Sequence, residues 1–500
     1  METLKKLRIE HLLIVFLLVL TATLRFVNLG YSDYIGDEHK AFFQPIPGQT
    51  TWNFIMSRRK GPMQFLVSAI PYQFTHDYRN ELAQRIPFAA ISVSAVIVFY
   101  FLVKKMTQNK LVAFVSAFLL SVNGFMVGFG RIAQYQNLNL LFSFLALFFY
   151  FDLLNDSKKE THLKSSRLGT LFYSLSVLSH WDAIFILPVV IYIFIKRKDL
   201  ELAQSNFRFG CLLLVPFLVP YTFYQLISPA NSAYFGRRIE LGHSNLVRYK
   251  LLIDLYNPYL TFWFLSVVGI IGAFRFKKNL PIFLWFLFGF LGFELFVRKP
   301  GTHIYNFVIP AIILAALGVD LLLKIKYLRT LAAVGLVFLL PYFYWQSCMV
   351  FLDHSKEYPW EQKRIFELRE LGITEQKRLR RKLYGDAYIK IYNFLRTETP
   401  KHTLGQKLPL FGFPHYRAWN EINEYIGGDV GYVTNEVKTI SEWYMDVPYR
   451  LEGTFYVVGV RKPLSFVNDW KVTNIGNKEK VHEIYNETGD IIVRIYLVEE

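Results

Sequence analysis

Cysteine is nearly absent from this sequence. Cys211 and Cys348 are the only two cysteines in 500 residues, and both lie within apolar runs. This scarcity excludes a fold held together by a framework of disulfides. The region beyond residue 352 has no cysteine at all, so cysteine usage does not indicate a redox compartment.

The sequence also lacks a basic tail or a basic helix face, although its formal net charge is +17. Nucleic-acid-binding proteins concentrate Lys and Arg in such features, so we do not expect nucleic acid as a partner. Lys and Arg occur here in short clusters between apolar runs. That arrangement is typical of the topology signal of a membrane protein.

Hydrophobic residues make up 53% of the chain, and phenylalanine alone accounts for 47 residues. Soluble proteins usually contain about 45–50% apolar residues. The excess is concentrated between residues 11 and 352, where apolar runs reach membrane-spanning length. We therefore predict an α-helical polytopic membrane protein with about eleven transmembrane helices. The predicted spans are residues 11–29, 86–103, 111–130, 138–154, 168–179, 183–195, 209–227, 260–274, 280–297, 304–323 and 331–352.

The pair of segments at 168–179 and 183–195 decides the topology, because it is either one long helix or two short ones. A basic segment precedes the pair at residues 158–167, and another follows at residues 196–198. The positive-inside rule places both in the cytoplasm and therefore requires two crossings. The N-terminus is then inside, the C-terminal region is outside, and Lys and Arg are about three times denser in the cytoplasmic segments than in the outer loops.

The chain is expected to divide into two domains. Residues 1–352 form the transmembrane domain, and its first outer loop, residues 30–85, contains an apolar stretch at 62–75 that is too short to span. We predict an interfacial or re-entrant helix there. Residues 353–500 are predicted to form a small extracytoplasmic α/β domain. Its expected elements are helices at 359–383 and 388–395, a strand at 454–460, and a hairpin of strands at 481–485 and 491–498.

Ionisable residues collect at the predicted outer surface. Charges within or beside transmembrane helices are costly, so they indicate function. The middle of the predicted membrane is almost free of charge, whereas an ion-coupled transporter places acidic residues near the midplane. We therefore expect chemistry at the outer surface. The residues concerned are Asp37, Glu38, Lys60, Arg85, Arg131, His180, Asp182, Glu294, Arg298 and His303.

Each of these residues also has an ordinary structural interpretation. Asp37 could act as a general base toward a hydroxyl, or it could cap a short interfacial helix. Lys60 and Arg131 suit a phosphate, but they also suit contact with lipid headgroups. His180 and His303, taken singly, fit a structural role. The common location of these residues on one side of the membrane is what favours a functional role.

Several stretches in fixed order resemble the membrane glycosyltransferases of the GT-C superfamily, specifically the family 39 protein mannosyltransferases and the related lipid A aminoarabinose transferases. The similarity covers residues 11–325, and it departs from the family at Lys60-Gly61-Pro62, which lacks one proline, and at His180, which replaces a lysine. The stretches are Leu24-Arg25-Phe26-Val27-Asn28-Leu29-Gly30 with Gly36-Asp37-Glu38, Lys60-Gly61-Pro62-Met63-Gln64-Phe65-Leu66, Arg85-Ile86-Pro87, Gly130-Arg131-Ile132-Ala133, Ser179-His180-Trp181-Asp182, and His303-Ile304-Tyr305 with Pro310.

The resemblance implies a polyprenyl-phosphate sugar as donor and a lipid, glycan or protein hydroxyl as acceptor. It implies that Asp37 is the base or the acceptor-binding carboxylate, with Glu38 in support. Phosphate contacts would come from Lys60, Arg131 and His303, which could stabilise the leaving group. No cofactor is expected, and the sequence does not support a divalent metal. Further candidate site residues are Arg85, His180, Asp182, Glu294 and Tyr305.

The expected protein is thus a multi-pass protein of the cell's inner or plasma membrane, in contact with membrane lipids, with its active site outside the cytoplasm. Three alternatives remain open at this point. One is a transporter or lipid-sugar flippase, and another is a membrane-anchored binding or sensor protein whose function lies in residues 353–500. The third, a polysaccharide ligase or polymerase, is expected to carry its main domain as a loop between late helices.

Overall fold

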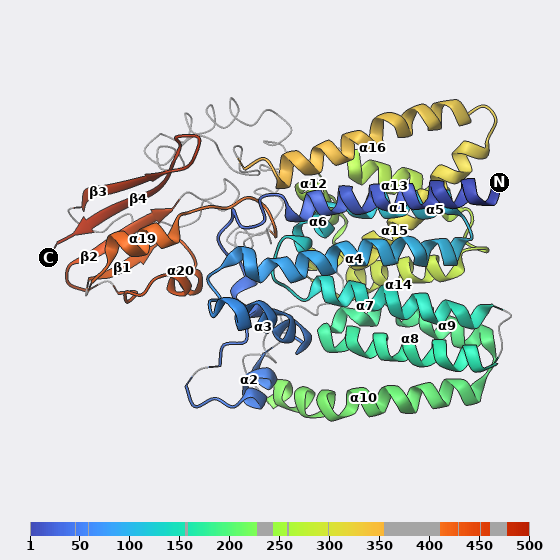
Figure 1. Ribbon diagram of the computed structural model, residues 1–500, viewed down its shortest axis with the longest axis horizontal. Coiled ribbons are helices and arrows are strands. Elements are labelled where there is room, and N and C mark those ends of the chain that lie inside the picture. The colour runs from blue at the N-terminus through green and yellow to red at the C-terminus, as the bar shows by residue number, and fades with distance from the viewer. Residues whose placement is uncertain are drawn as a thin grey trace. The chain divides into compact units, whose positions relative to one another are not determined.

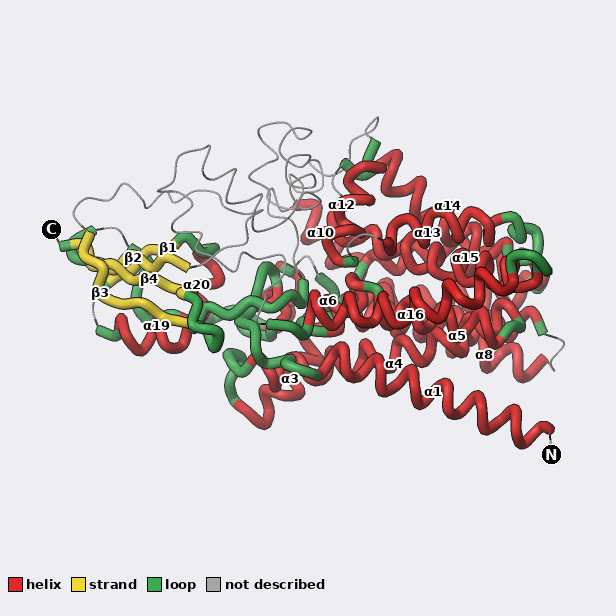
Figure 2. Tube along the Cα trace, turned by 90° about the horizontal axis from the view of Figure 1, so that it is seen from above, coloured by secondary structure: helices red, strands yellow, loops and turns green. Residues whose placement is uncertain are grey.

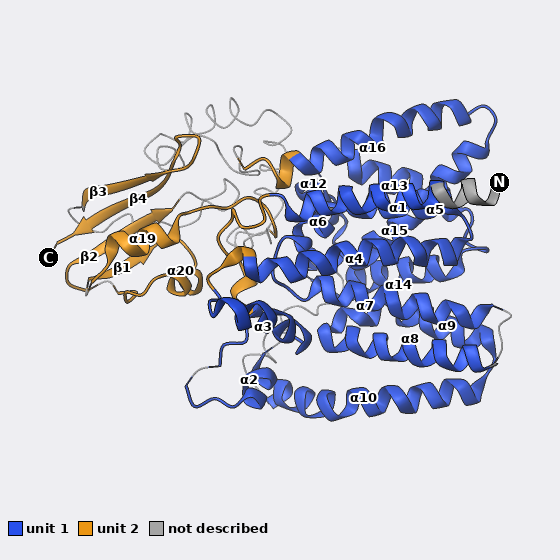
Figure 3. Ribbon diagram, viewed as in Figure 1, with its two compact units in different colours: residues 1–27, 41–78, 83–348 blue, residues 28–40, 79–82, 349–500 orange. Residues whose placement is uncertain are grey.

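The structure is a computed structural model, and its described residues form two compact units (Figure 3). The helical unit comprises Met1–Val27, Ala41–Tyr78 and Ala83–Cys348, and the mixed unit comprises Asn28–Lys40, Arg79–Leu82 and Met349–Glu500. The described residues are 2–45, 47–58, 60–155, 159–227, 244–257, 260–298, 300–354, 411–428, 430–450, 452–460 and 478–499. The helices predicted at 359–383 and 388–395 lie outside them.

The helical unit is a bundle of long apolar helices (Figure 1). Its α-helices are α1 (Glu2–Phe26), α2 (Thr51–Ser57), α3 (Met63–Thr75), α4 (Glu81–Thr107), α5 (Lys110–Val122), α6 (Gly124–Gly130), α7 (Gln136–Tyr150), α8 (Lys159–Ser179), α9 (Leu187–Arg197), α10 (Leu200–Ile227), α12 (Leu246–Tyr256), α13 (Leu260–Ala273), α14 (Leu280–Phe296), α15 (Tyr305–Lys324) and α16 (Arg329–Phe351). Short 3₁₀ turns are η1 (Glu38–Ala41), η2 (Phe151–Leu154), η3 (Trp181–Ile186) and η4 (Gly301–Ile304).

Each predicted span coincides with a helix or with a bent pair of helices. Among the described residues, six helices are long and apolar enough to cross a membrane, and up to eight spans result if each bent pair is one span. The structure therefore confirms a mostly helical membrane protein, while the count of eleven crossings stays a prediction. The stretch predicted as an interfacial helix forms α3.

The bend between α5 and α6 follows from one residue. Asn123 ends α5 and also caps α6, because its side chain accepts a hydrogen bond from the Phe125 amide. Asparagine is among the preferred N-cap residues. The two helices consequently meet at 61°, so the predicted span at 111–130 is broken near the end that the sequence places outside.

Close helix contacts in the core depend on glycine. A Cβ atom on Gly272 of α13 would lie 1.8 Å from the Leu314 carbonyl oxygen of α15, and one on Gly318 of α15 would lie 2.0 Å from the Val268 carbonyl oxygen of α13. Small residues allow two helix backbones to approach in this way. In an apolar 18-residue stretch of the helix that includes α15, 78% of the residues are buried, whereas in that of α10 only 6% are. Helix α15 is therefore central in the bundle and α10 is peripheral.

Ion pairs tie helices together at the end of the bundle that carries the basic clusters. Glu10 of α1 pairs with Lys104 of α4 and Lys110 of α5. Asp320 of α15 accepts from Arg275 at 2.7 Å. These pairs join segments that are far apart in the sequence. They neutralise charged side chains at the end of the bundle that is predicted to be cytoplasmic.

The mixed unit contains a four-stranded sheet of order β1-β2-β4-β3. Its strands are β1 (Gly431–Thr434), β2 (Phe455–Val460), β3 (Lys478–Tyr485) and β4 (Ile491–Val498), and its helices include α19 (Trp419–Ile426) and α20 (Lys438–Tyr444). Only the β1–β2 pair is parallel. Helix α19 lies along one face of the sheet (Figure 2). The predicted small α/β fold and its terminal hairpin are therefore confirmed.

The mixed unit also includes two segments of the first outer loop, residues 28–40 and 79–82. The sequence does not predict this grouping, because it places the whole loop 30–85 with the transmembrane domain. The compact units divide near the expected boundary at residue 352, between Cys348 and Met349. The division at 352 into separately folding domains stays a prediction.

Candidate active site

A buried carboxylate lies at the turn between α8 and α9. Helix α8 ends at Ser179, and His180 then caps η3, with its Nδ1 atom accepting a hydrogen bond from the Asp182 amide at 3.2 Å. The extended backbone of His180 ends α8, and η3 begins at the next residue, so the turn is short. It carries Asp182 into the bundle, where the side chain is 1% exposed.

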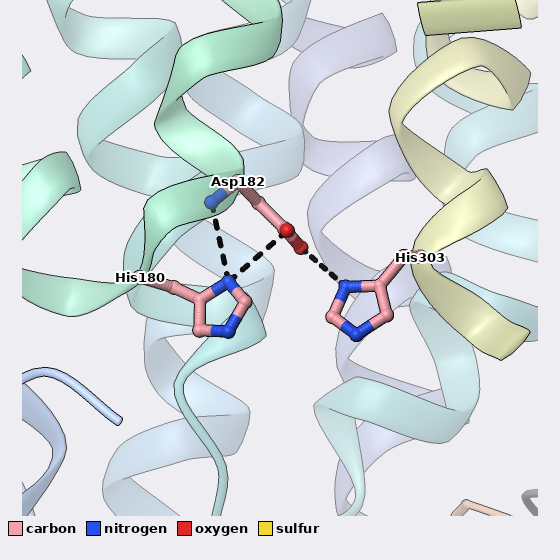
Figure 4. Close-up of side chains that lie close together, drawn as sticks. All are labelled: His180, Asp182 and His303. Atoms are coloured by element: carbon pink, nitrogen blue, oxygen red, sulfur yellow. Dashed lines mark hydrogen bonds and ion pairs between the residues drawn. The ribbon is translucent and has the colours of Figure 1, made fainter. Parts of the chain in front are cut away.

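Asp182 gathers groups from a distant part of the chain. Its Oδ2 atom accepts from the Tyr305 hydroxyl at 2.7 Å and from His303 Nδ1 at 2.8 Å. These two residues lie at η4 and the start of α15, 121 or more positions away in sequence. Four of the predicted candidates therefore form one cluster: His180, Asp182 and His303 (Figure 4) and, bonded to the carboxylate, Tyr305.

The two imidazole rings of the cluster present the same edge. They are stacked at 5.5 Å between centroids and 16° between planes. Figure 4 shows their Nδ1 edges toward Asp182 and their Nε2 edges away from it, on the same side. Because His180 Nδ1 is an acceptor, a neutral His180 carries its proton on Nε2. The exposed edge of that ring is therefore a hydrogen-bond donor.

Lys60 lies beside this pair of rings. Its Nζ atom is 5.3 Å from the centroid of Tyr135, whose ring stacks on His180 at 3.9 Å. Glycine at position 61 makes this approach possible, since a Cβ atom there would lie 1.9 Å from the Leu178 carbonyl oxygen of α8. The Lys60-Gly61-Pro62 stretch thus packs against the end of α8. This packing places Lys60 next to the turn that contains His180.

Electrostatics favour an ionised Asp182. Burial raises the pKa of this carboxyl, but the charges and hydrogen bonds of His180 and His303 outweigh burial and hold its pKa below the usual range. Burial lowers the pKa of His180, although Asp182 favours its charged form. We therefore treat Asp182 as a carboxylate that orients the imidazoles.

The cluster also has the composition of a metal site. Among the described residues, one ligand atom from each of His180, Asp182 and His303 lies within 4.8 Å of the others. Within the described ranges, Asp182 Oδ1 has no hydrogen-bond partner, and it lies 3.1 Å from His180 Nδ1. Two imidazoles and a carboxylate suit a divalent transition metal. The donor set fits such an ion, which the sequence analysis did not expect.

Arg131 has a different environment from the imidazole cluster. Its Nη1 atom donates to the carbonyl oxygens of Leu24 at 3.1 Å and Val27 at 2.8 Å, at the end of α1. Carbonyl groups at a helix C-terminus lack partners further along the helix, so these bonds from Arg131 stabilise the C-terminus of α1. The role in phosphate binding predicted for Arg131 stays a prediction.

Arg25 belongs to the same group as Arg131 and was not singled out from the sequence. It is fully buried at the end of α1 and donates to the Ser121 carbonyl at 2.5 Å, while its Nη2 atom has no hydrogen-bond partner in the described part of the chain. Both Arg25 and Arg85 are close enough to Arg131 to interact with it electrostatically. Arg25 lies within the Leu24–Gly30 stretch of the family resemblance, and that was the signal that could have identified it.

Glu294 is held in a separate place. Both of its carboxylate oxygens accept from the Asn245 amide at 3.1 Å, near the start of α12. A carboxylate at a helix N-terminus is favourable, so these contacts explain Glu294 as a support for α12. The structure does not group it with His180 and Asp182.

Asp37 and Glu38 lie in the mixed unit. The Asp37 side chain is 50% exposed and pairs with Lys40 at 2.6 Å. Glu38, at the start of η1, is fully buried. Gly36 precedes them with φ +64°, a conformation that favours glycine. The Gly36-Asp37-Glu38 stretch is therefore a tight turn that exposes the first carboxylate and buries the second.

Comparison with known proteins matches the family described as dolichyl-phosphate-mannose-protein mannosyltransferase over residues 59–224. A relative, an uncharacterized protein of Aquifex aeolicus (strain VF5), is 24% identical over 314 residues. That match covers 58% of this chain and 60% of the relative. The chain thus spans less than two thirds of this relative's length.

Two solved structures share the fold. ArnT from Cupriavidus metallidurans, in the apo state, has a TM-score of 0.55 at 13% identity, and 97% of each chain is covered. The oligosaccharyltransferase AglB from Archaeoglobus fulgidus has a TM-score of 0.51 at 12% identity, covering 91% of this chain and 70% of that one. The chain is thus similar to dolichyl-phosphate-mannose-protein mannosyltransferases over residues 59–224, and it shares its fold with ArnT and AglB, in agreement with the resemblance to glycosyltransferase family 39 found in the sequence.

Proposed function

We propose that this protein is an integral membrane glycosyltransferase that moves a sugar from a polyprenyl-phosphate carrier to a hydroxyl acceptor. The family match over residues 59–224 supports this activity. ArnT has also been solved bound to undecaprenyl phosphate, with the same TM-score of 0.55 and 11% identity. AglB was solved with a dolichol-phosphate. Both carriers are lipid phosphates, which supports the same chemical class of donor here.

The observation that carries the proposal is the pair of imidazoles fixed by Asp182. Cleavage of the bond between sugar and phosphate leaves negative charge on the phosphate oxygen. Preorganised donors aimed at that charge lower the barrier. The Nε2 edges of His180 and His303 lie on one side (Figure 4), and Lys60 adds a positive charge beside them. These three residues are the proposed phosphate-binding group.

Asp37 is the proposed general base for the acceptor hydroxyl. It is the exposed carboxylate of its turn, and an exposed carboxylate is accessible to a substrate. Glu38 is buried and is assigned a supporting role.

We further propose that the chemistry takes place outside the cytoplasm. The candidate groups of the helical unit lie at the ends of α1, α8 and α14 and at the starts of α4 and α15, and the basic clusters lie at the opposite helix ends. By the positive-inside rule, the basic ends are cytoplasmic. Lipid-linked donors are suited to this side, where nucleotide sugars are not supplied.

The test is incubation of the purified protein with a panel of polyprenyl-phosphate sugars, followed by measurement of free polyprenyl phosphate. We expect release with at least one member of the panel, and none with protein that carries Asp37→Asn. Each reaction is run with a chelator and with added Mn²⁺ or Zn²⁺, which shows whether the His180, Asp182 and His303 group needs an ion. Absence of release across the panel under all of these conditions contradicts the proposal.

A further inference from the structure

We propose that the C-terminal domain positions the Gly36-Asp37-Glu38 turn for catalysis, and that Tyr444 is the positioning residue. This inference rests on the proposed function, because it assigns a role to the domain through Asp37. The geometry that supports it lies wholly within the mixed unit, where residues 28–40 and 411–460 belong to one compact body.

The segment before the turn pairs with the chain just ahead of α19. The Asp33 amide donates to the His415 carbonyl at 2.8 Å. The His415 amide donates to Ser32 Oγ at 3.0 Å, and the Arg417 amide donates to Asp33 Oδ2 at 2.5 Å. Three successive bonds of this kind fix both the register and the direction of residues 32–33. The loop is therefore held by the backbone of the C-terminal domain.

Tyr444, the last residue of α20, adds a contact closer to the Gly36-Asp37-Glu38 turn. We call these contacts between residues 32–34 and the C-terminal domain the clamp. Its hydroxyl accepts from the Tyr34 amide at 2.7 Å and donates to Glu81 Oε1 at 2.6 Å. One hydroxyl thus joins both loop segments of the mixed unit. Tyr444 and Tyr34 are 0% and 1% exposed, and their rings are stacked at 6.1 Å. Buried hydrogen bonds of this kind are costly to break.

The second loop segment is attached to the same place. Arg79 donates through Nε to the Trp443 carbonyl at 3.1 Å and through Nη2 to Asp446 at 2.8 Å. These residues flank Tyr444 at the end of α20. The Trp443 ring also lies 5.9 Å from the ring of His39, which follows Glu38 directly. Contacts therefore reach the turn from both sides in the sequence.

These contacts indicate that the C-terminal domain fixes the position of the catalytic turn. A domain that served only to bind a ligand would not need them. Asp37 is half exposed and pairs with Lys40 of its own turn. The chain on either side of it, at Tyr34 and His39, is held by Tyr444 and Trp443 of α20. A reacting group displaced by about 1 Å can lose roughly 10²-fold in rate. Loosening the clamp is expected to lower the rate of transfer while leaving donor binding intact.

The test uses the full-length protein with Tyr444→Phe, which removes the hydroxyl and keeps the ring. Hydrogen exchange at the Tyr34 amide should become faster, and kcat should fall by about tenfold or more, with the KM for the donor unchanged. Tyr485→Phe is the matched control, because its hydroxyl bonds Glu483 on β3 instead of the loop. That variant should keep the wild-type kcat. If Tyr444→Phe does not fold, Ser32→Ala removes the acceptor of the His415 amide and should act in the same direction.

A double-mutant cycle with Asp37→Asn separates positioning from a general effect on stability. In the Asp37→Asn background, Tyr444→Phe should cause little further loss, because its effect passes through Asp37. An equal fold-loss in both backgrounds would overturn the inference, and so would unchanged exchange at the Tyr34 amide. A wild-type rate for Asp37→Asn alone would contradict the proposed base, and the exchange measurement would still decide whether Tyr444 holds the turn.

Discussion

Asp182 shows how a single residue can organise a site within an apolar bundle. It contacts His180 from its own turn, and it accepts from His303 and Tyr305 at the start of α15. A buried charge is tolerated only when it is paired and hydrogen-bonded. The hydrogen bonds from His303 and Tyr305 to Oδ2 pair the charge. The first of them orients the His303 ring, and the Asp182 amide, which donates to His180 Nδ1, orients the other ring.

Replacing Asp182 by Asn should therefore impair donor use more than folding. The amide keeps the size of the side chain but loses the charge that orients His303 and lies beside His180. We expect donor affinity to fall by roughly 10- to 100-fold, the range observed when a carboxylate that orients histidine at a metal site is removed. Donor titration measures this. The control is Asp320→Asn, a carboxylate that is also buried, at 3% exposure, and pairs with Arg275 at the other end of the bundle. An equal loss of affinity in the control would contradict the account.

Asp37→Asn distinguishes a general base from a capping residue. Asn is as good a cap as Asp, so thermal stability should stay near that of the wild type. An amide has no basic lone pair of useful pKa, and loss of a general base costs about 10²–10⁴-fold in rate. Transfer assays should show this loss with donor binding retained, and Glu38→Gln should do less damage. A wild-type rate for Asp37→Asn would mean that the base lies elsewhere.

At the scale of elements, the packing of the Lys60-Gly61-Pro62 stretch against α8 is the contact that places Lys60. Gly61→Ala would set a Cβ atom 1.9 Å from the Leu178 carbonyl oxygen, which forces the two segments apart. We expect weaker donor binding and a lower melting temperature. Gly335→Ala in α16 is the control, since no described atom beyond its own stretch of helix lies within 4 Å of the added Cβ. That change should be neutral or stabilising by up to about 1 kcal/mol, the helix propensity gained.

Hydrophobic patterning predicts elements well where a segment is long or flanked by clear signals. The apolar runs of α1, α4 and α15 and the hairpin of β3 and β4 were predicted for this reason. Strand β1 is only four residues long, and α12 lies in a loop without a long apolar run, so neither was predicted. Short elements are fixed by their neighbours in the folded chain, which a local pattern does not describe.

The sequence predicted which residues belong to the candidate site, but not which of them lie together in the folded protein. His180, Asp182 and His303 were each chosen for charge at an outer helix end. Their meeting depends on α15 packing against the turn after α8, across 121 residues of sequence. The division of the predicted residues into an imidazole cluster, an arginine group around Arg131 and a separate Glu294 is likewise a tertiary property.

At the scale of the whole molecule, the topology sets which side of the membrane each part faces. The positive-inside rule and an odd number of crossings predict that the C-terminus and Asp37 are on the same, outer side. A C-terminal reporter that is active only in the cytoplasm should give no signal, and one active only outside should give a strong one. A strong cytoplasmic signal would contradict the eleven-helix topology and the proposed side of the chemistry.

The most direct test of the central claim follows the fate of the donor lipid in sealed vesicles that contain the protein. A polyprenyl-phosphate sugar is labelled in both the sugar and the lipid, an acceptor mixture is added, and both labels are traced by mass spectrometry. A transferase is predicted to yield free polyprenyl phosphate and a sugar joined to the acceptor, with both lost in Asp37→Asn. Intact donor that has only moved to the other leaflet would contradict the account and indicate a flippase.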